Sequence, residues 1–424
     1  MDVSDNQNSY IYRIGLFLSI MYVFFRFVAN GDFFPYVLQQ IALYCLLGYG
    51  ALIILWEITH GCFIIPEFSL YYIVILLLCI LTNVYGEKKE LIPGNMYSMI
   101  VCFLLTFTIC IFIRSKKDFV FFCWGNIITS IVMALLLFIS GKFYGTRVER
   151  LGNDISGNAN VFAMGMMYPC MFALWLMIYA HYKKTVKLIL LFSIIIDMYA
   201  ITLSAGRKSF ILPFVFFYLL LLYKRDDQNQ KQRHIIKYTL ITIAIVTLSV
   251  ELLQNIPVLY NSVGSRIEQM LNELTGKGVV DNSTLVRSEF RKIAIEGWLK
   301  SPIFGHGFDS FKPYALERTG FYAYSHCNQT ELLYCGGLIL FVAYYGGYIH
   351  LFFKAKKACL PNEYSAFIKA AILAEFIFDF GLVSYNVFFV QSFIMLTYLA
   401  AGFTDQDNQD RIQFNQRQVS KYIR

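Results

Sequence analysis

The chain has 424 residues, of which 57% are hydrophobic and 15% are charged, and its mean hydropathy is +0.54. Apolar runs of roughly 17 residues or more recur along the whole chain, and each is long enough to cross the hydrocarbon core of a bilayer. This composition excludes a soluble globular protein and predicts an all-α, polytopic helical membrane protein. The formal charge of +8 would suit nucleic acid, but the distribution of the charges has a simpler explanation.

The apolar runs predict about twelve transmembrane helices. The first run carries Arg13 and Arg26 and lacks a small-residue cleavage site, so we expect a retained span rather than a signal peptide. Nine spans fill residues 1–254, a large polar loop with short helices occupies 255–330, three spans fill 331–403, and 404–424 form a tail. The predicted spans are 11–29, 35–58, 66–85, 93–113, 119–141, 160–180, 188–204, 209–223, 236–254, 331–353, 364–382 and 385–402.

The lysines and arginines between the spans set the orientation. With a cytoplasmic N-terminus, about 18 basic residues lie in the inward loops and the tail, against about 7 in the short outward loops. Both termini are therefore predicted to be cytoplasmic, and the large loop is predicted to face outward. The positive charge follows from this topology and requires no nucleic acid. The tail 404–424, rich in Gln, Asn, Asp and Arg, is predicted to be disordered.

The large loop contains a predicted amphipathic helix at 285–300, with Val286, Phe290, Ile293 and Trp298 on one side. Arg287 and Arg291 stand four residues apart on it, where like charges repel. A bound anion would remove that repulsion, and guanidinium groups match phosphate oxygens in pairs. The alternative is a solvated face on which a neighbouring glutamate pairs with these arginines.

Arg207 and Lys208 follow the seventh predicted span directly, on the outward side. Basic residues at span ends commonly extend to the membrane surface, which is the simpler interpretation. However, this connection is only a few residues long, and lysine and arginine are disfavoured on that side. The pair also faces the same compartment as Arg287, so we expect it to bind a ligand.

The large loop has two further features. The sequence Pro-Ile-Phe-Gly-His-Gly at 302–307 predicts a turn whose glycines allow positive φ or a close backbone approach. His326 lies just before the tenth span, where an imidazole could act as a general base or a hydrogen-bond donor. A lone histidine is more often a satisfied interfacial residue.

Several acidic residues fall inside predicted spans, namely Asp197, Glu251, Glu375 and Asp379. Such residues are costly in lipid and mark functional or paired sites, so they are the main argument for a transporter. The outward loops have no convincing metal motif, and neither a metal nor a cofactor is predicted. The ten cysteines are scattered, without a C-x-x-C pair, and are interpreted as small hydrophobic residues.

In order along the chain, four segments resemble the O-antigen polymerase and O-antigen ligase family of bacterial membrane glycosyltransferases. Residues 152–160 are similar to its glycine- and asparagine-rich loop, and 203–209 resemble its outward arginine turn. Residues 283–287, continuing to 302–307, resemble the helix and P-I-x-G-x-G turn of its large loop. Residues 325–333 resemble its H-x-N-x-x-E-L-L segment. The resemblance covers roughly 147–345, and the second glycine of the family's following G-x-x-G pair is missing here.

The resemblance implies a function. Family members transfer an undecaprenyl-pyrophosphate-linked glycan to an acceptor sugar on the outer face, inverting the anomeric centre without a metal. The roles carried over are Arg207 and Arg287 as clamps on the leaving pyrophosphate and His326 as the residue that orients or deprotonates the acceptor hydroxyl. The expected substrate-binding residues are Arg291, Lys208, Asn328, Arg147, Arg150 and Asn160.

The leading hypothesis is a polysaccharide polymerase for capsule, exopolysaccharide or O-antigen in the bacterial cytoplasmic membrane, with its active site outside the cytoplasm. Its expected partners are the lipid-linked oligosaccharide, membrane lipid, a flippase and a chain-length regulator. One alternative is a ligase that moves the glycan to another acceptor. The second is a flippase for the lipid-linked oligosaccharide or another transporter, for which internal repeats are expected; none is visible in the sequence.

Overall fold

The computed structural model describes residues 3–28, 34–86, 94–141, 150–152, 158–224, 231–257, 260–265, 268, 282–356 and 360–403. Arg147 and the tail 404–424, whose disorder was predicted, lie outside these residues. In the described part every regular element is a helix, which confirms the all-α prediction. The helices are α1 (Val3–Val28), α2 (Tyr36–Thr59), α3 (Glu67–Val84), α4 (Gly94–Phe112), α5 (Lys116–Ile139), α7 (Ala159–Tyr179), α8 (Lys184–Leu203), α9 (Arg207–Tyr223), α10 (Lys231–Asn255), α13 (Asn282–Trp298), α14 (Phe311–Thr319), α15 (Asn328–Lys354), α16 (Asn362–Phe378) and α17 (Phe388–Ala400), with a π-helical turn at Tyr260–Gly264 and a 3-10 turn at Asp379–Gly381.

Among the described residues, eight helices are long and apolar enough to cross a membrane: α1 to α5, α7, α8 and α15. The other four predicted spans coincide with α9, α10, α16 and α17. Of these, α9 and α16 have 17 residues and α17 has 13, so they are shorter than a typical span. The fourth, α10, has 25 residues but is less apolar than its neighbours.

The outer surface of the bundle is apolar. Leu52 and Leu55 of α2 are 64% and 60% exposed, and Ile195 of α8 is 60% exposed. Many large hydrophobic residues on α2, α3, α5 and α8 share this exposure, far more than the surface of a soluble monomer carries. A bilayer would cover such a surface, which agrees with the apolar composition of these helices.

Helix α7 lies at the centre of the bundle and is buried over most of its length. Aromatic rings from distant helices interlock around it. Phe172 of α7 packs against Phe367 of α16 and Phe393 of α17, and Phe216 of α9 contacts the same two rings. These edge-to-face and stacked contacts hold together the helices whose ends carry the candidate site.

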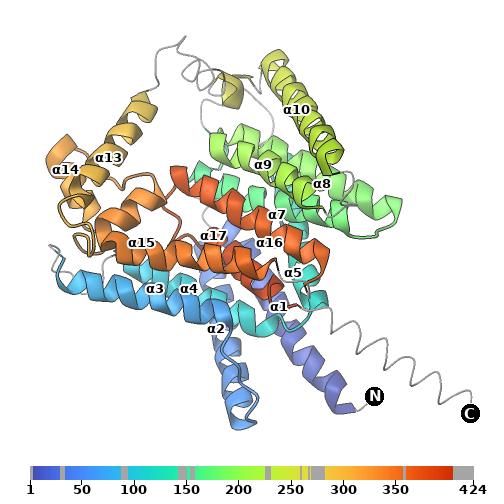
Figure 1. Cartoon of the computed structure of the whole chain (residues 1–424). Helices are drawn as coiled ribbons and strands as arrows, with labels where there is room; N and C mark the ends of the chain where they lie inside the picture. Colours follow the sequence, from blue (N-terminus) through green and yellow to red (C-terminus); the bar gives the residue numbers. More distant parts are fainter. Residues whose placement is uncertain are drawn as a thin grey trace, which may run out of the picture.

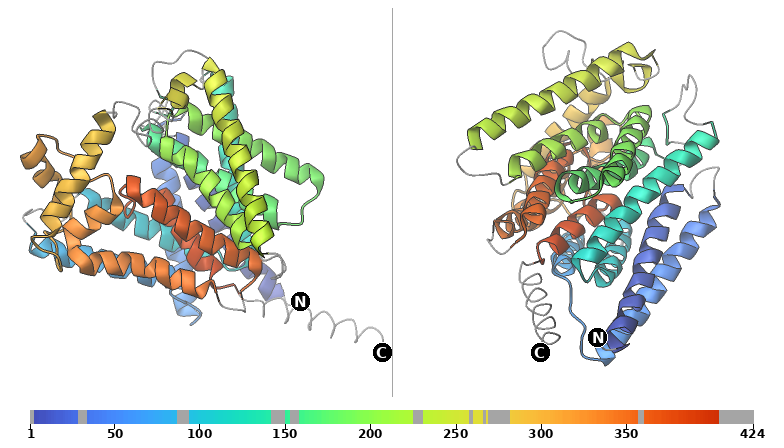
Figure 2. Two further views of the ribbon diagram at one scale, coloured as in Figure 1. Left: turned by 45° about the horizontal axis from the view of Figure 1, so that its top comes forward. Right: turned by 90° about the vertical axis from the view of Figure 1, so that its right-hand side faces the viewer.

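The loop helices α13 and α14 lie together at one end of the molecule, at the left of Figure 1, while α10 runs along the top and α1 begins at the lower right. The left-hand view of Figure 2 also places α13 and α14 apart from the start of α1. The connections of the bundle that were predicted to face outward meet here. Leu151 donates to the carbonyl of Leu203, and Tyr85 donates to the carbonyl of Phe304.

Candidate functional site

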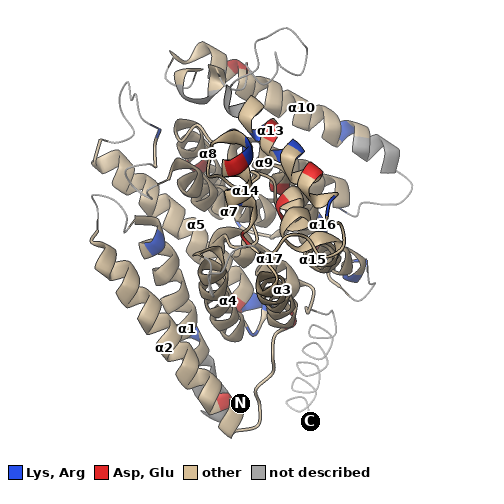
Figure 3. Cartoon of the chain, turned by 90° about the vertical axis from the view of Figure 1, so that its left-hand side faces the viewer, with Lys and Arg blue, Asp and Glu red and all other residues tan. Residues whose placement is uncertain are grey.

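Basic residues from two distant segments meet at the loop end of the bundle. Lys208, in the first turn of α9, is electrostatically coupled to Arg287 and Arg291 on α13, about eighty residues further along the chain. His326, in the turn before α15, is coupled to all three. Figure 3 views this end and shows charged residues on α13 and α14 above helices that are mostly tan. The structure thus brings together four of the predicted site residues.

Helix α13 presents the two arginines because its opposite side is buried. Phe290 and Ile293 are 2% and 3% exposed and pack against α14 and the start of α15. Arg287 and Arg291 stay half-buried beside them. Val286, predicted on the buried side, is instead 40% exposed, because the helix turns that residue away from α14.

Lys208 lies deep in the cluster. Its ammonium group donates a hydrogen bond to the carbonyl of Gly381, at the end of α16. Burial, followed by the charges of Arg287 and Arg291, lowers the pKa of Lys208 from 10.5 to about 7. Near neutral pH the amine is therefore only partly protonated, and a nearby anion would favour its charged form.

His326 is held in an aromatic pocket. Its ring stacks on Phe290 at 5.9 Å between centroids and lies 4.3 Å from the ring of Tyr324. Burial, followed by the charges of Arg287 and Lys208, lowers the pKa of His326 from 6.5 to about 4. The imidazole is therefore neutral at physiological pH, and a neutral ring can accept a proton or donate a hydrogen bond.

The backbone at His326 has φ +58°, a left-handed conformation that costs a non-glycine residue roughly 1 kcal/mol or more. The neighbouring residues hold it there. Ser325 donates from its backbone N–H to the carboxyl of Glu331 at 2.7 Å, and its hydroxyl donates to the carbonyl of Cys327 at 2.9 Å. Thr330 donates to the Ser325 hydroxyl at 3.1 Å. Strain retained in this way is common at functional sites.

Arg207 begins α9 next to Lys208, and its charge contributes to lowering the pKa of Lys208. The turn that carries both is fixed from the side by Arg150, which donates to the carbonyl of Ser204 and to the side chain of Asn160, each at 2.8 Å. Arg150 and Asn160 therefore support the turn of Arg207.

Asn328 is fully buried below the turn of His326. Its side-chain NH2 donates to the hydroxyl of Tyr345 at 3.1 Å and to Asp379 at 3.5 Å. Its side-chain oxygen accepts from the backbone N–H of Ser384 at 3.0 Å. These bonds tie the start of α15 to the segment between α16 and α17, so Asn328 shapes the turn.

The turn at 302–307 docks on a break in α15. Gly337 interrupts the helix with φ +61° and ψ −160°, which leaves the backbone groups around it without helical partners. The turn supplies them: His306 and Gly307 donate to the carbonyls of Tyr334 and Cys335, and Leu338 donates to the carbonyl of Pro302, at 2.8–2.9 Å. The glycines of the turn do adopt positive φ, as predicted, at Gly305 and Gly307.

Several residues of this site could not be identified from the sequence. Phe290 was predicted only as a buried residue and Tyr324 was not singled out, yet both rings pack on His326. Glu331 was noted only as part of a motif, although it holds the turn. Gly381, which accepts from Lys208, carried no signal because its contact is through the backbone.

The cluster combines positive charge with a neutral imidazole, which suits binding of a phosphate-containing anion beside a proton acceptor. In the described part of the chain, no group of three or more His, Cys, Asp or Glu could hold a metal ion. Neither the known protein-family models nor the curated proteins include a match to this chain.

Proposed function

We propose that the protein is a polysaccharide polymerase that transfers an undecaprenyl-pyrophosphate-linked glycan to an acceptor lipid-linked repeat unit. The observation that carries the proposal is the cluster of Lys208, Arg287 and Arg291 beside the neutral ring of His326. The sequence resemblance points to the same residues. We further propose twelve spans, cytoplasmic termini and an active site on the outer face of the bacterial cytoplasmic membrane.

In this mechanism the acceptor hydroxyl attacks the anomeric carbon, and the bond from that carbon to the pyrophosphate oxygen breaks. Negative charge grows on the leaving pyrophosphate, where Lys208, Arg287 and Arg291 stabilise it, with Arg207 at the edge of the group. The proton of the acceptor hydroxyl passes to the neutral imidazole of His326. A ligase would share the donor half of this site and differ in its acceptor.

Donor binding would also make His326 a stronger base. In the free protein, burial and then the charges of Arg287 and Lys208 disfavour an imidazolium at position 326. A bound pyrophosphate would cancel much of that field, because opposite charges close to a cation reduce its effect on a third group. The pKa of His326 would then rise toward its ordinary value, and the base would become stronger only when donor is present.

The test is a reconstituted assay with purified full-length protein and a defined lipid-linked repeat unit, read as a ladder of chain lengths with and without a chelator. We expect ladders under both conditions. Arg207→Ala and Arg287→Ala should each abolish long chains while the protein inserts at the wild-type level. Normal chain-length ladders in both variants would refute the role of Arg207 and Arg287 in holding the leaving pyrophosphate.

His326→Ala provides a separate test of the acceptor side. We expect it to slow polymerisation more than it weakens donor binding, which can be measured with a non-transferable lipid-linked analogue. If donor binding alone were lost and turnover of bound donor were normal, the role of His326 as base would be wrong.

A transporter remains a second candidate because of one observation. Glu375 of α16 carries a carboxyl group that is buried in the bundle close to the hydroxyl of Tyr168, and a buried acid in a membrane helix can mark an ion pathway. If Glu375→Gln abolished transport of a lipid-linked substrate while Arg287→Ala had no effect on either transport or ladders, transport would be the better assignment.

A further inference from the structure

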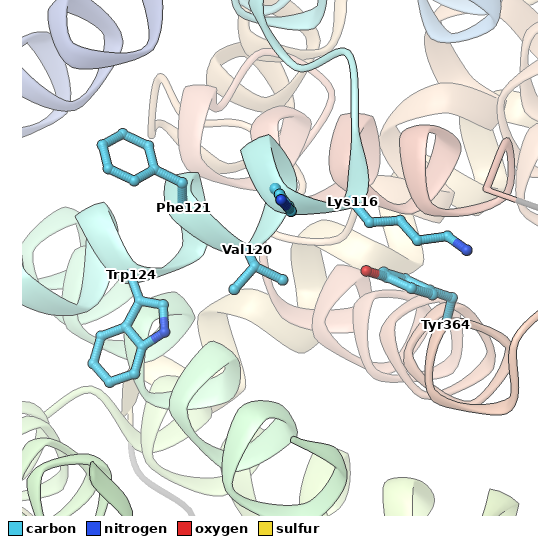
Figure 4. A pocket seen from close by; sticks show the side chains of 6 residues that line it. Lys116, Val120, Phe121, Trp124 and Tyr364 are labelled. Carbon is cyan, nitrogen blue, oxygen red and sulfur yellow. The ribbon is translucent and has the colours of Figure 1, made fainter. Parts of the chain in front are cut away.

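A hollow on the surface lies at the far end of α16 from the cationic cluster. It is lined by Lys116, Lys117, Val120, Phe121, Trp124 and Tyr364 (Figure 4). Helix α16 begins beside this hollow and ends just before Gly381, which contacts Lys208. Seventeen residues of α-helix separate the two places, so they are roughly 25 Å apart along the helix axis. The hollow is therefore not part of the candidate active site.

The floor of the hollow is rigid. Tyr364 is 4% exposed, and its ring packs on Phe119 at 5.7 Å, Trp175 at 5.6 Å and Phe403 at 5.1 Å. Within the described residues, the hydroxyl of Tyr364 makes no hydrogen bond. A ring fixed in this way offers a hydroxyl donor that needs no rearrangement to bind a ligand.

Two lysines at the start of α5 supply positive charge. Lys117 is exposed and has no ionic partner in the described part of the chain, and the side chain of Lys116 extends toward Tyr364 in Figure 4. Asp118 on this helix accepts from the hydroxyl of Ser115 at 2.7 Å and from the backbone N–H of Arg114 at 3.3 Å, and the half-buried Glu363 of α16 lies near Tyr364. The positive end of the helix dipole adds to the attraction for an anion.

The wall of the hollow is apolar and aromatic. Trp124 is held by a hydrogen bond from its indole N–H to the hydroxyl of Tyr182 at 3.1 Å. Phe121, one turn earlier on α5, is 50% exposed and faces the surroundings of the bundle. Tryptophan and tyrosine favour the depth of lipid headgroups, where one side is wet and the other is apolar.

We propose that this hollow binds an anionic glycerophospholipid, whose phosphate contacts Lys116, Lys117 and the hydroxyl of Tyr364 and whose acyl chain follows Val120 and Phe121. Basic pockets between membrane helices at the headgroup level are suited to such lipids. Free glycerol phosphate shares the headgroup chemistry but cannot make the apolar contacts. This inference is independent of the proposed polymerase activity.

Native mass spectrometry of the full-length protein tests the proposal, with titrations of dioleoyl phosphatidylglycerol, dioleoyl phosphatidylcholine and glycerol 3-phosphate. We expect the first phosphatidylglycerol to bind roughly tenfold or more tightly than phosphatidylcholine. Lys116→Gln with Lys117→Gln should remove that preference. The matched control, Lys237→Gln with Lys356→Gln, also removes two lysines but leaves the hollow intact. This control should keep the preference for phosphatidylglycerol.

A second measurement detects bound lipid through the quenching of tryptophan fluorescence. Phosphatidylglycerol with brominated acyl chains should quench tryptophan fluorescence more than brominated phosphatidylcholine does. Trp124→Phe should lose this difference, and Trp298→Phe, at the other end of the molecule, should keep it. Equal binding of the two lipids, an unchanged preference in the lysine variant, or equal competition by glycerol 3-phosphate would each overturn the proposal.

Discussion

Two sets of basic residues, one at each end of the bundle, have different neighbours, although Arg318 at the loop end also pairs with Glu296. At the end of the hollow, Arg114 pairs with the buried Glu57, and His350 and Lys354 pair with Glu67. At the loop end, Lys208 donates to a carbonyl and is surrounded by the charges of arginines. Cations neutralised by the protein's own acids stabilise the fold, whereas gathered cations repel one another unless an anion binds. The contrast separates structural charges from candidate binding charges.

The largest effect that tests this contrast is expected for Arg287→Ala. Loss of one charged donor from a transition-state clamp lowers the rate of chain extension by about 100-fold or more. Thermal stability should change much less than the rate, because α13 is held in place by its buried residues Phe290 and Ile293 rather than by Arg287. Rate and unfolding temperature should be measured on the same preparation, with Arg287→Lys as the variant that keeps the charge and loses the planar fork. A variant that lost stability in proportion to activity would contradict the binding role.

Gly305→Ala tests whether the stability of the protein depends on the contact between the turn at 302–307 and α15. A Cβ atom at this residue would lie 2.6 Å from the backbone of Cys335 and Gly336, in a region of positive φ. We expect destabilisation of about 3 kcal/mol, measured as chemical or thermal unfolding in detergent.

Gly320→Ala is the matched control for that change. Gly320 also has positive φ, at +78°, but a Cβ there would meet nothing within 4 Å. Backbone strain alone should cost about 1 kcal/mol. Equal losses in the two variants would show that the contact with α15 is unimportant.

Arg114→Ala tests whether the ion pair between Arg114 and Glu57 stabilises the fold. It leaves the carboxyl of Glu57, which is 1% exposed, without its guanidinium partner. Because Arg114 itself is one-third exposed, we expect a loss of about 1–2 kcal/mol in unfolding free energy. Activity per folded molecule should stay normal. Adding Glu57→Gln should recover part of the loss, and a failure to do so would argue against the pair as the cause.

The pH dependence of the rate tests His326. Only the neutral imidazole accepts a proton, so the rate falls as pH drops through its pKa. In kcat/KM, which reports the free enzyme, the acidic limb should lie near the pKa of about 4. In kcat, which reports the donor complex, it should lie about one pH unit higher or more, because the bound anion raises the pKa. Coincident limbs in wild type, or unchanged limbs in His326→Gln, would exclude this role.

The smallest expected effect concerns Lys208. Its pKa of about 7 in the free protein should rise when the anionic donor binds. Binding above pH 7 should therefore take up as much as about one proton, and affinity should fall as pH rises. Calorimetry in buffers of different ionisation enthalpy measures the uptake. Lys208→Arg, which stays charged, should abolish it, and equal uptake in that variant would assign the proton to another group.

The helices could be predicted from the sequence because each apolar run is a local pattern. The two segments of the cationic cluster could also be named, since Arg207 and Lys208 interrupt an apolar sequence and Arg287 and Arg291 recur at helical spacing. Their meeting depends on how α9 and α13 pack, which no local pattern specifies. For the same reason the sequence alone does not place Lys208 beside His326.

Contacts made through the main chain could not be predicted. The break at Gly337 is stabilised by backbone groups more than thirty residues away in the chain, at 302–307. The glycines there indicated a close approach but not what is approached. The role of Asn328 was similarly hidden, because its partners Asp379 and Ser384 lie about fifty residues away.

The joint between the turn at 302–307 and the broken helix α15 determines which residues of this region can be substituted during evolution. Its hydrogen bonds use only main-chain atoms, and the side chains of Ile303 and Phe304 are 55% and 56% exposed. Substitutions at these two residues leave the joint intact, provided that Gly305 and Gly337 are kept. Selection can therefore alter this exposed surface while the backbone joint beneath it stays constant.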